Sequence, residues 1–426
     1  MKFKVQVKGF LEGVLASFEV ATRGVVKDFY GTDKINIDCK NDKIILSSFG
    51  GRVGLYNSLD NKNNSFLNFI FEAEGSATVS AKDLVGVLQS FHSNETLCIE
   101  LRSSSGSKEV YFSMESDAEQ YQTLPCYDRK IALPQKTDDF SKVVTIHKDL
   151  LLKGMKKVLY AIGFEKDRRE FMIWYMTIWK NKVRFSSGSG ARHAMYEVEG
   201  DSVVSSDPVE TKIIIPKEYI TILSKSISLT NTDVIIIKES KRKDTLPFHT
   251  VLECDSQEFI LSGIDPSLKT PDEEKMFSLD YPIKMTVRIG DISPAVMGMA
   301  ATFNDQVRND NKSHKIEWDI DLNKKEIKFK ANEYMKSVRK TPIQEVLVTN
   351  GVDKINLSSI SLYLSEIVKG ENENEYIQIE VIEPKKPVII YKYASNKVMN
   401  GSALKNVDKV NNYSERFITC FGTYGT

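Results

Sequence analysis

The sequence has no excess of charge of either sign, because 58 lysines and arginines balance 58 aspartates and glutamates. This balance excludes a whole-molecule attraction to nucleic acid, so any basic surface must be local and offset by acidic residues elsewhere. The sequence also lacks an apolar run near the roughly 20 residues of a membrane-spanning helix, and its start, MKFKVQVKGFLEGVL, has no signal-peptide pattern. We therefore expect a cytoplasmic protein.

Cysteine is scarce, and the motifs of common enzymes are absent. The five cysteines are widely spaced and form no C-x-x-C pair, which argues against a disulfide framework or a zinc site. There is no G-x-x-x-x-G-K-[ST], H-E-x-x-H or G-x-S-x-G sequence, and the five histidines have no metal-ligand spacing. The segment GSGAR (Gly188–Arg192) is too short for a phosphate-binding loop. We predict a protein that is not an enzyme and has no metal or cofactor.

What the sequence does contain is a pattern best seen in Val352–Tyr393. Apolar residues between Ile360 and Val368 form one stripe of a helix that follows a strand. After a polar turn, alternating apolar residues predict a hairpin made of residues 376–381 and 388–391. The order of elements is strand, helix, hairpin.

The same order recurs in every third of the chain, and each third also begins with a strand and a helix. These starts, about 140 residues apart, have a domain-sized period; they are Phe3–Phe18, Val144–Ile162 and Met285–Phe303. Two helices in each third and antiparallel hairpins in most of the rest predict an α+β fold, with helices on one face of antiparallel sheets. We predict three tandem domains and a C-terminal extension, with the bounds 1–135, 136–280, 281–394 and 395–426.

The helix expected at Lys148–Ile162 has an apolar side and a basic side. Its apolar stripe, within about 40° at 100° per residue, consists of Leu151, Met155, Val158 and Ile162. The opposite arc has no acidic residue and carries Lys153, Lys156, Lys157 and Tyr160. A solvated charged face is the ordinary explanation of such a helix, and a phosphate-binding face is the alternative.

Three tandem units of this kind resemble the bacterial replicative sliding clamp, the beta subunit of DNA polymerase III, from Met1 to about Tyr393. The motifs that carry the resemblance, in their order along the chain, are QYQTLP (Gln120–Pro125), KIIIPKEYI (Lys212–Ile220), KTPD (Lys269–Asp272) and KKPVIIYKY (Lys385–Tyr393). The resemblance implies a six-domain ring, made by two subunits that join head to tail, with helices around the hole and sheets outside.

The resemblance also implies contacts with DNA that carry no sequence information. Arg23 and Lys27 follow the first helix, and Arg168 and Arg169 lie in a loop that the family uses for DNA contact. Each alone is more often an ordinary surface cation. The candidates are Arg23, Lys27, Lys153, Lys156, Lys157, Tyr160, Arg168, Arg169, Lys217 and Lys225.

The family further has a groove between its second and third domains, into which polymerase and clamp loader insert a short apolar motif. Three departures from the family's pattern, Ser189, Ala191 and His193, bear on partner specificity. Val388 and Ile390 are equally well explained as core residues, and Gly190 as a turn residue. The positions matched to the groove are Gly190, Arg192, His193, Pro271, Met276, Asn356, Val388 and Ile390.

Residues 394–426 extend beyond the part that resembles the family. They allow a flexible tail, an added strand or a segment lying over the groove, and their polar composition favours a partly ordered tail.

We predict a homodimeric DNA sliding clamp and processivity factor. Its expected partners are double-stranded DNA, a DNA polymerase, a clamp loader and a second copy of itself, and no membrane. The alternative is a structural or regulatory protein of the same fold that binds polymerase or loader without encircling DNA, which the sparse basic residues of the first and last thirds keep open. A trimeric clamp of two-domain chains is disfavoured, because this chain has three units. The divergence is compatible with a phage-encoded version acting in an infected host cell, and otherwise we expect the bacterial cytoplasm or nucleoid.

Overall fold

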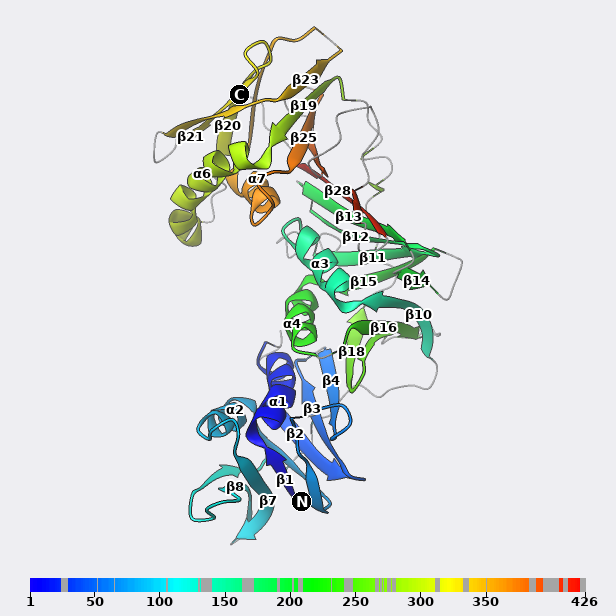
Figure 1. Cartoon of the computed structure of the whole chain (residues 1–426), viewed down its shortest axis with the longest axis vertical. Helices are drawn as coiled ribbons and strands as arrows, with labels where there is room; N and C mark the ends of the chain where they lie inside the picture. The colour runs from blue at the N-terminus through cyan, green and yellow to red at the C-terminus, as the bar shows by residue number, and fades with distance from the viewer. Residues whose placement is uncertain are drawn as a thin grey trace. The chain divides into compact units, whose positions relative to one another are not determined.

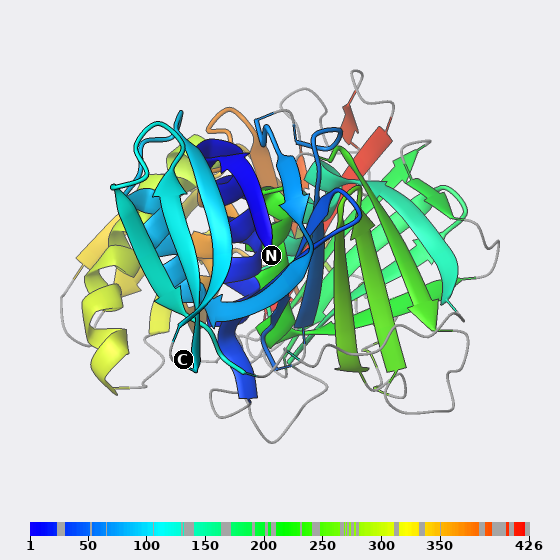
Figure 2. The ribbon, with the colours of Figure 1, turned by 90° about the horizontal axis from the view of Figure 1, so that it is seen from below.

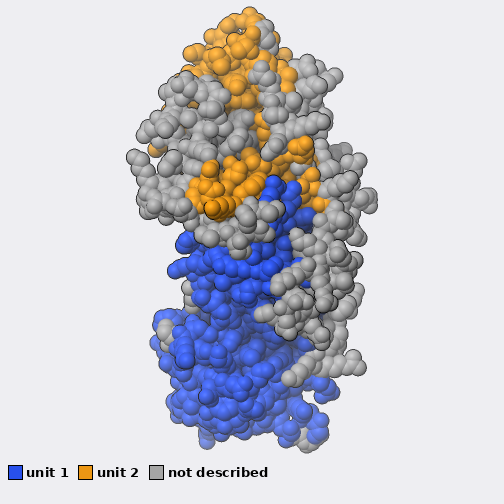
Figure 3. All heavy atoms as spheres, turned by 90° about the vertical axis from the view of Figure 1, so that its right-hand side faces the viewer, with its two compact units in different colours: residues 1–153, 203–267 blue, residues 154–202, 268–426 orange. Residues whose placement is uncertain are grey.

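The structure is a computed structural model with two compact units (Figure 3). Unit 1 comprises residues 1–153 and 203–267, and unit 2 comprises residues 154–202 and 268–426. No helix in the described part of the chain is long and apolar enough to cross a membrane. The described residues are 1–23, 30–51, 53–64, 66–104, 106–128, 131, 140–162, 172–189, 192–200, 203–205, 210–230, 232–240, 248–264, 268, 270, 272–273, 277, 281–310, 315–331, 337–349, 351–382, 388–393, 406–408 and 413–421.

The first third of the chain has the predicted order of strand and helix, hairpins, and a second helix before the last strands (Figure 1). Its elements are β1 (Lys2–Gln6), α1 (Val7–Thr22), β2 (Tyr30–Lys40), β3 (Lys43–Phe49), β4 (Val53–Leu59), β5 (Ile70–Ala73), β6 (Gly75–Ser80), α2 (Ala81–Gln89), β7 (Thr96–Ser104), β8 (Ser107–Met114) and β9 (Tyr121–Pro125).

The middle and last thirds repeat this order, and the last third is followed by two further strands. The middle elements are β10 (Phe140–His147), α3 (Lys148–Leu159), β11 (Ile173–Trp179), β12 (Lys182–Gly188), β13 (Arg192–Gly200), β14 (Val203–Ser205), β15 (Thr211–Pro216), α4 (Lys217–Ser228), β16 (Val234–Ser240), β17 (Phe248–Cys254) and β18 (Gln257–Ile264). The remaining elements are β19 (Ile283–Arg288), α6 (Ile289–Asp310), β20 (Lys315–Asp321), β21 (Glu326–Ala331), β22 (Ser337–Pro342), β23 (Glu345–Val348), β24 (Lys354–Ile360), α7 (Ser361–Val368), β25 (Tyr376–Val381), β26 (Val388–Tyr393), β27 (Asn406–Asp408) and β28 (Tyr413–Phe421).

Local sequence signals set several of these boundaries. Asn41 and Asp42, at φ of 50° and 57°, form the tight turn between β2 and β3, a conformation that asparagine and aspartate tolerate better than most residues. Ser80 caps α2, because its side chain accepts a hydrogen bond from the Asp83 backbone N–H at 3.3 Å. Gly370, at φ of 69°, follows α7 in the left-handed conformation that commonly ends a helix.

Unit 1 contains two antiparallel sheets. Their strand orders are β5-β1-β7-β8-β9 and β14-β10-β16-β17-β18-β4-β3-β2-β6. Helix α1 contacts α2, α4 and the β2, β3 and β4 strands. The core beneath α1 is aromatic, since Phe3, Phe10 and Phe112 are fully buried and the Phe3 and Phe10 ring centroids lie 6.0 Å apart.

The large sheet of unit 1 joins the first third of the chain to the middle third at one strand pair, which we call the first seam. There β4 pairs directly with β18, Val53–Asn57 against Gln257–Leu261. Figure 2 shows the green strands of residues 234–264 beside the blue strands of residues 30–59.

Unit 2 also contains two antiparallel sheets. One has the order β22-β21-β20-β24, and the strands of the other run β11-β12-β13-β28-β26-β25-β19-β23, with β27 paired to β28. Helix α6 contacts α7, β21 and β22. The part of α3 that belongs to unit 2 lies close against β12, because a Cβ added to Gly154 would meet the Phe185 ring at 2.4 Å.

The C-terminal extension forms an internal strand of this sheet. Strand β28 pairs with β13 over Arg192–Gly200 and with β26 over Val388–Tyr391. Of the three alternatives for the extension, the structure has the added strand, at residues 413–421. The partly ordered tail that the composition favoured is wrong for these residues. Composition missed it because the pairing depends on strands about 30 to over 200 residues away, which no local polarity encodes. We call the β13, β28 and β26 strands together the second seam.

Candidate DNA-facing helices and partner-peptide site

Helix α3 is amphipathic as the sequence predicts. The predicted stripe residues Leu151, Met155, Val158 and Ile162 are all 1% exposed or less, although the helix ends at Leu159, before the predicted Ile162. On the other side, Lys156 is exposed, whereas Lys153 and Tyr160 are half-buried. This side offers at least one exposed cation, Lys156, for a polyanion.

Lys157 differs from its neighbour Lys156, because it has an acidic partner. Its Nζ donates to a carboxylate oxygen of Glu371 and lies 6.0 Å from the centroid of the Phe417 ring. The Lys157 side chain is 21% exposed and that of Glu371 14%. Much of the positive charge of Lys157 is thus neutralised within unit 2, which helical periodicity alone did not reveal because Glu371 lies more than 200 residues away.

The other predicted DNA-contact residues have mixed surroundings. Lys225 is exposed in the last turn of α4, and Lys217 is half-buried in its first. Arg23 directly follows α1 and pairs with Glu19 on the preceding turn. Lys27, Arg168 and Arg169 lie outside the described residues.

The helices of the last third present little positive charge where their side chains are described. Along residues 289–300 of α6, the exposed positions are Pro294 and Gly298, and in residues 364–368 of α7 the exposed one is Glu366. A basic lining built from these segments would be uneven, as the sequence predicts.

The predicted groove residues fall on either side of β28. In the strand register, Arg192 and His193 lie opposite Phe421 and Cys420, while Val388 and Ile390 lie opposite Phe421 and Thr419. Because β28 intervenes, the two halves are separated by two strand spacings, about 9.6 Å in all. Gly190, Pro271 and Met276 lie outside the described residues.

Val388 and Ile390 are core residues in this structure. Both are fully buried. Side chains alternate along a strand, so Ile389 points to the opposite face, where it clusters with Met195, Tyr281 and Phe277. The residue of β26 that belongs with the outer-face cluster is therefore Ile389, one position from the predicted pair.

Asn356, one of the positions matched to the groove, lies within a strand. It is an exposed residue of β24, opposite Asp319 of β20, in the separate β22-β21-β20-β24 sheet. Its side-chain amide, in the orientation that satisfies both neighbours, donates to the Asp319 carboxylate at 3.3 Å.

His193 belongs to a buried polar cluster on the outer face of β11, β12 and β13. Its Nε2 lies 2.8 Å from Glu273 Oε1, and the Tyr175 hydroxyl donates to the same oxygen at 2.9 Å. Arg184 donates from Nη1 to Glu273 Oε2 at 3.1 Å and from Nη2 to Glu197 Oε2 at 2.7 Å. We call these five residues the Glu273 cluster.

Burial and charge oppose each other at Glu273. Burial by itself raises the pKa of this carboxyl, but the hydrogen bond and charge of His193, together with Arg184, outweigh it and lower the pKa to about 2. Burial and the neighbouring Glu273 carboxylate raise the pKa of Tyr175, so its hydroxyl stays a donor. Glu273 is therefore a buried carboxylate that contacts the sheet through Arg184, His193 and Tyr175.

Sequence reasoning did not single out this cluster. Glu273 lies in a polar loop sequence, where a solvated carboxylate is the simplest expectation. Gly188 is a local sequence feature that the cluster explains, because a Cβ at this position would meet His193 Nδ1 at 2.3 Å. The glycine leaves room for the histidine ring directly across the hairpin.

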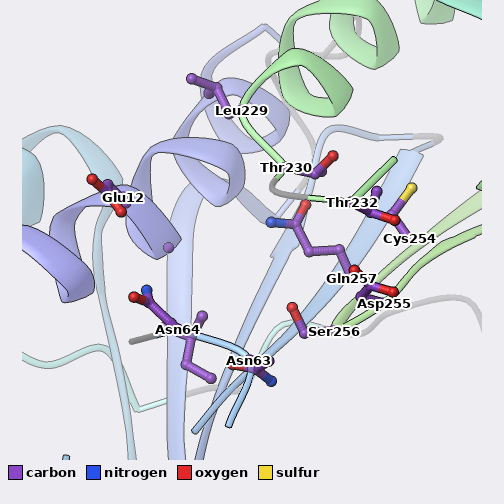
Figure 4. Close-up of a pocket in the computed structure, with 12 residues that line it drawn as sticks. Glu12, Asn63, Asn64, Leu229, Thr230, Thr232, Cys254, Asp255, Ser256 and Gln257 are labelled. Atoms are coloured by element: carbon purple, nitrogen blue, oxygen red, sulfur yellow. The ribbon is translucent and has the colours of Figure 1, made fainter. Parts of the chain in front are cut away.

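Unit 1 has a small polar pocket near the first seam (Figure 4). Its volume is about 40 Å³, and Asn63, Asn64, Thr232 and Gln257 are among the side chains lining it. That volume suits three or four water molecules at most, each needing about 10–15 Å³. We interpret it as a hydration site. No group of three or more histidine, cysteine or acidic side chains suited to a metal occurs among the residues described.

The architecture of the whole chain is that of a sliding clamp. The DNA polymerase sliding clamp of Bacillus subtilis matches with a TM-score of 0.76 at 13% identity, covering 100% of this chain and 99% of that one. The beta subunit of the Streptococcus pyogenes DNA polymerase matches with a TM-score of 0.76 at 12% identity, and the Pseudomonas aeruginosa DNA polymerase III subunit beta with 0.74 at 14%, each covering 100% of both chains. No protein-family model and no curated protein sequence matches the chain. The predicted α+β clamp fold is thus confirmed over the full length.

Proposed function

We propose that this protein is a DNA sliding clamp, which encircles duplex DNA and tethers a polymerase to it. The full-length match to solved clamps, despite identities of 12% to 14%, is the observation that carries the proposal. A clamp holds DNA by topology, so its contacts need be only few, loose and salt-sensitive. A chain without net charge that presents Lys156 and Lys225 on helices meets that requirement. No step of this function needs a catalytic residue, and its place is the cytoplasm or nucleoid.

Ring formation requires edge strands on each subunit that can pair with those of the next. Strand β9 ends one sheet of unit 1, and β22 ends one sheet of unit 2. Both edges expose a large side chain, Tyr121 at 56% and Val338 at 57%. Exposed edges of this kind favour pairing with another chain. We propose that β22 of each protomer pairs with β9 of its partner. The two equivalent interfaces close a head-to-tail homodimer.

Light scattering after gel filtration tests this pairing. Val338→Asp is expected to convert a dimer to a monomer, because it places a charge in the proposed apolar contact. Leu347→Asp is the matched control, since Leu347 is also an exposed edge residue, at 50%, but on β23 of the other sheet. A monomeric parent chain at micromolar concentration, or equal effects of both variants, would contradict the proposal.

Encirclement is tested by retention on DNA. With a purified clamp loader and ATP, the chain is expected to co-elute with nicked circular plasmid and to be released when the plasmid is cut once. Lys156→Glu is expected to reduce the retained fraction several-fold and to flatten its salt dependence, whereas Lys62→Glu, at an exposed loop position, is not. Retention on linear DNA equal to that on circles would contradict topological binding.

A second candidate function is a clamp-fold regulator that binds polymerase or loader without encircling DNA. The pairing of Lys157 with Glu371, and the uncharged or acidic exposed positions of α6 and α7, favour it. In the same assay such a protein is expected to bind a loader but to stay off circular DNA.

A further inference from the structure

Two neighbouring lysines on the basic side of α3 have different surroundings. Lys156 is exposed, and it forms an ion pair with none of the described residues. Lys157, the next residue, donates from Nζ to a carboxylate oxygen of Glu371. Helical periodicity places both lysines on the same side of the helix, so it predicts the same role for both. The acidic partner is what distinguishes Lys157.

Glu371 reaches α3 from the turn that follows α7. The helix ends at Val368, Gly370 has a φ of 69°, and the Glu371 backbone N–H donates to the Val368 carbonyl at 3.3 Å. These contacts fix the backbone from which the carboxylate extends. The Glu371 side chain is 14% exposed, and that of Lys157 is 21% exposed, beside the Phe417 ring. An ion pair that is partly buried in this way is screened by salt less than an exposed pair is.

The Lys157 ammonium is therefore already paired with a carboxylate when a polyanion approaches. A phosphate contacts this ammonium only by displacing Glu371 or by lying next to it, where two negative charges repel each other. Both routes reduce the free energy that a phosphate contact with Lys157 contributes. Lys156 has no such competitor, so a phosphate contact with Lys156 carries no such cost.

We propose that Glu371 sets the affinity of the basic side of α3 for DNA, because its carboxylate competes with DNA phosphates for the Lys157 ammonium. The chain then makes fewer effective phosphate contacts than its lysines suggest, and its contact with the duplex stays weak. This inference rests on the proposed function, since it takes DNA as the ligand of this side of α3. It goes beyond that function in assigning the strength of the contact to an acidic residue.

Lysine reactivity, measured without DNA, tests the first half of the proposal. The full chain is treated with limiting acetic anhydride, and mass spectrometry gives the rate at each lysine. Glu371→Gln is expected to raise the rate at Lys157 toward that at Lys156. Glu373→Gln is the matched control, because Glu373 is exposed in the same turn and the substitution removes the same charge. An unchanged Lys157 rate in Glu371→Gln, or an equal increase in Glu373→Gln, would overturn the proposal.

Binding of a short linear duplex, followed by fluorescence anisotropy, tests the second half. Glu371→Gln frees one phosphate contact, so a rise from about 50 to 200 mM salt should weaken its binding about threefold more than that of Glu373→Gln. At the lower salt concentration, Glu371→Gln should also bind the duplex more tightly than Glu373→Gln does. Equal affinities and salt dependences of the two variants, or no duplex binding by Glu371→Gln, overturn the proposal.

The double variant Lys157→Gln with Glu371→Gln removes the ion pair as a unit and keeps the net charge of the chain. It should bind the duplex as the parent chain does, whereas Lys156→Gln should bind it more weakly. If Glu371→Gln does not fold, this comparison decides, and equal losses overturn the proposal. Retention on circular plasmid is measured on the parent chain, so failure of this inference and failure of the clamp function are distinguishable.

Discussion

The two seams join sheets in the same way but differ in what lies between them. At the first seam, β4 and β18 are direct neighbours, and Phe259 opposite Leu55 is fully buried. At the second seam, β28 separates β13 from β26, and its Phe417 is 8% exposed. The first seam is therefore held by one strand pairing, whereas the second depends on two pairings, one on each side of β28.

The outer faces of the seams differ as well. An open groove of about 740 Å³, with Ile45, Tyr56 and Glu258 among its lining residues, lies over the first seam. Over the second, Glu273 and Phe277 reach the sheet, Glu273 through Arg184 and His193. The difference teaches that a repeated fold need not repeat its surfaces. Each seam can be tested by substitutions of matched size.

The largest effect is expected at the first seam. Phe259→Ala removes a fully buried ring and should lower the free energy of unfolding by about 3–5 kcal/mol, because it loses burial and leaves a cavity. Urea denaturation followed by circular dichroism measures it. Ile45→Ala, on the half-exposed face of the same sheet, is the control and should cost much less. Equal losses would mean that the first seam is not packed as described.

The next largest effect is expected at the Glu273 cluster. Glu273→Gln keeps the shape but removes the charge that faces Arg184 and His193, and should cost about 3 kcal/mol, as for other broken buried pairs. Glu366→Gln, an exposed change, should stay within about 0.5 kcal/mol. A neutral Glu273→Gln would show that the cluster does not anchor its segment.

The same cluster predicts a pH dependence. The pKa of Glu273 is lowered from 4.5 to about 2, so the stability it contributes is fully present above about pH 4.5 and is lost as the pH falls toward 2. Between these pH values the parent chain should therefore lose more stability than Glu273→Gln does. Thermal melts of both chains from pH 6 down to acid measure the difference, and parallel curves would contradict the assignment.

The smallest effect on global stability is expected at β28. Phe417→Ala should lower the free energy of global unfolding by less than Phe259→Ala does, because Phe417 is 8% exposed whereas Phe259 is fully buried. Hydrogen exchange of the β28 amides should become faster. The two measurements together sharpen the contrast with Phe259→Ala. A global loss as large as that of Phe259→Ala would show that the two seams are equally fixed.

Much of the fold was predictable because its signals are local. A few neighbouring residues are enough to predict each of three features. These are the hairpin turn at Asn41 and Asp42, the end of a helix at Gly370 and the apolar stripe of α3. Of the candidate site, the exposure of Lys156 was predictable from helical periodicity. The ion pair of Lys157 was not predictable, because no residue near Lys157 in the sequence indicates that Glu371 is its partner.

The sequence by itself determined the repeated order of strands and helices, because periodicity and turn chemistry act over short distances. The α+β clamp fold followed from the resemblance of its motifs to a known family. The tertiary structure alone decided that residues 413–421 become an internal strand, that Ile389 and not its neighbours joins the outer-face cluster, and that Glu273 is a buried anchor. Those outcomes depend on strand register and on burial beside distant residues. A change of register by one residue moves every side chain of a strand to the other face, and no single stretch of sequence fixes the register.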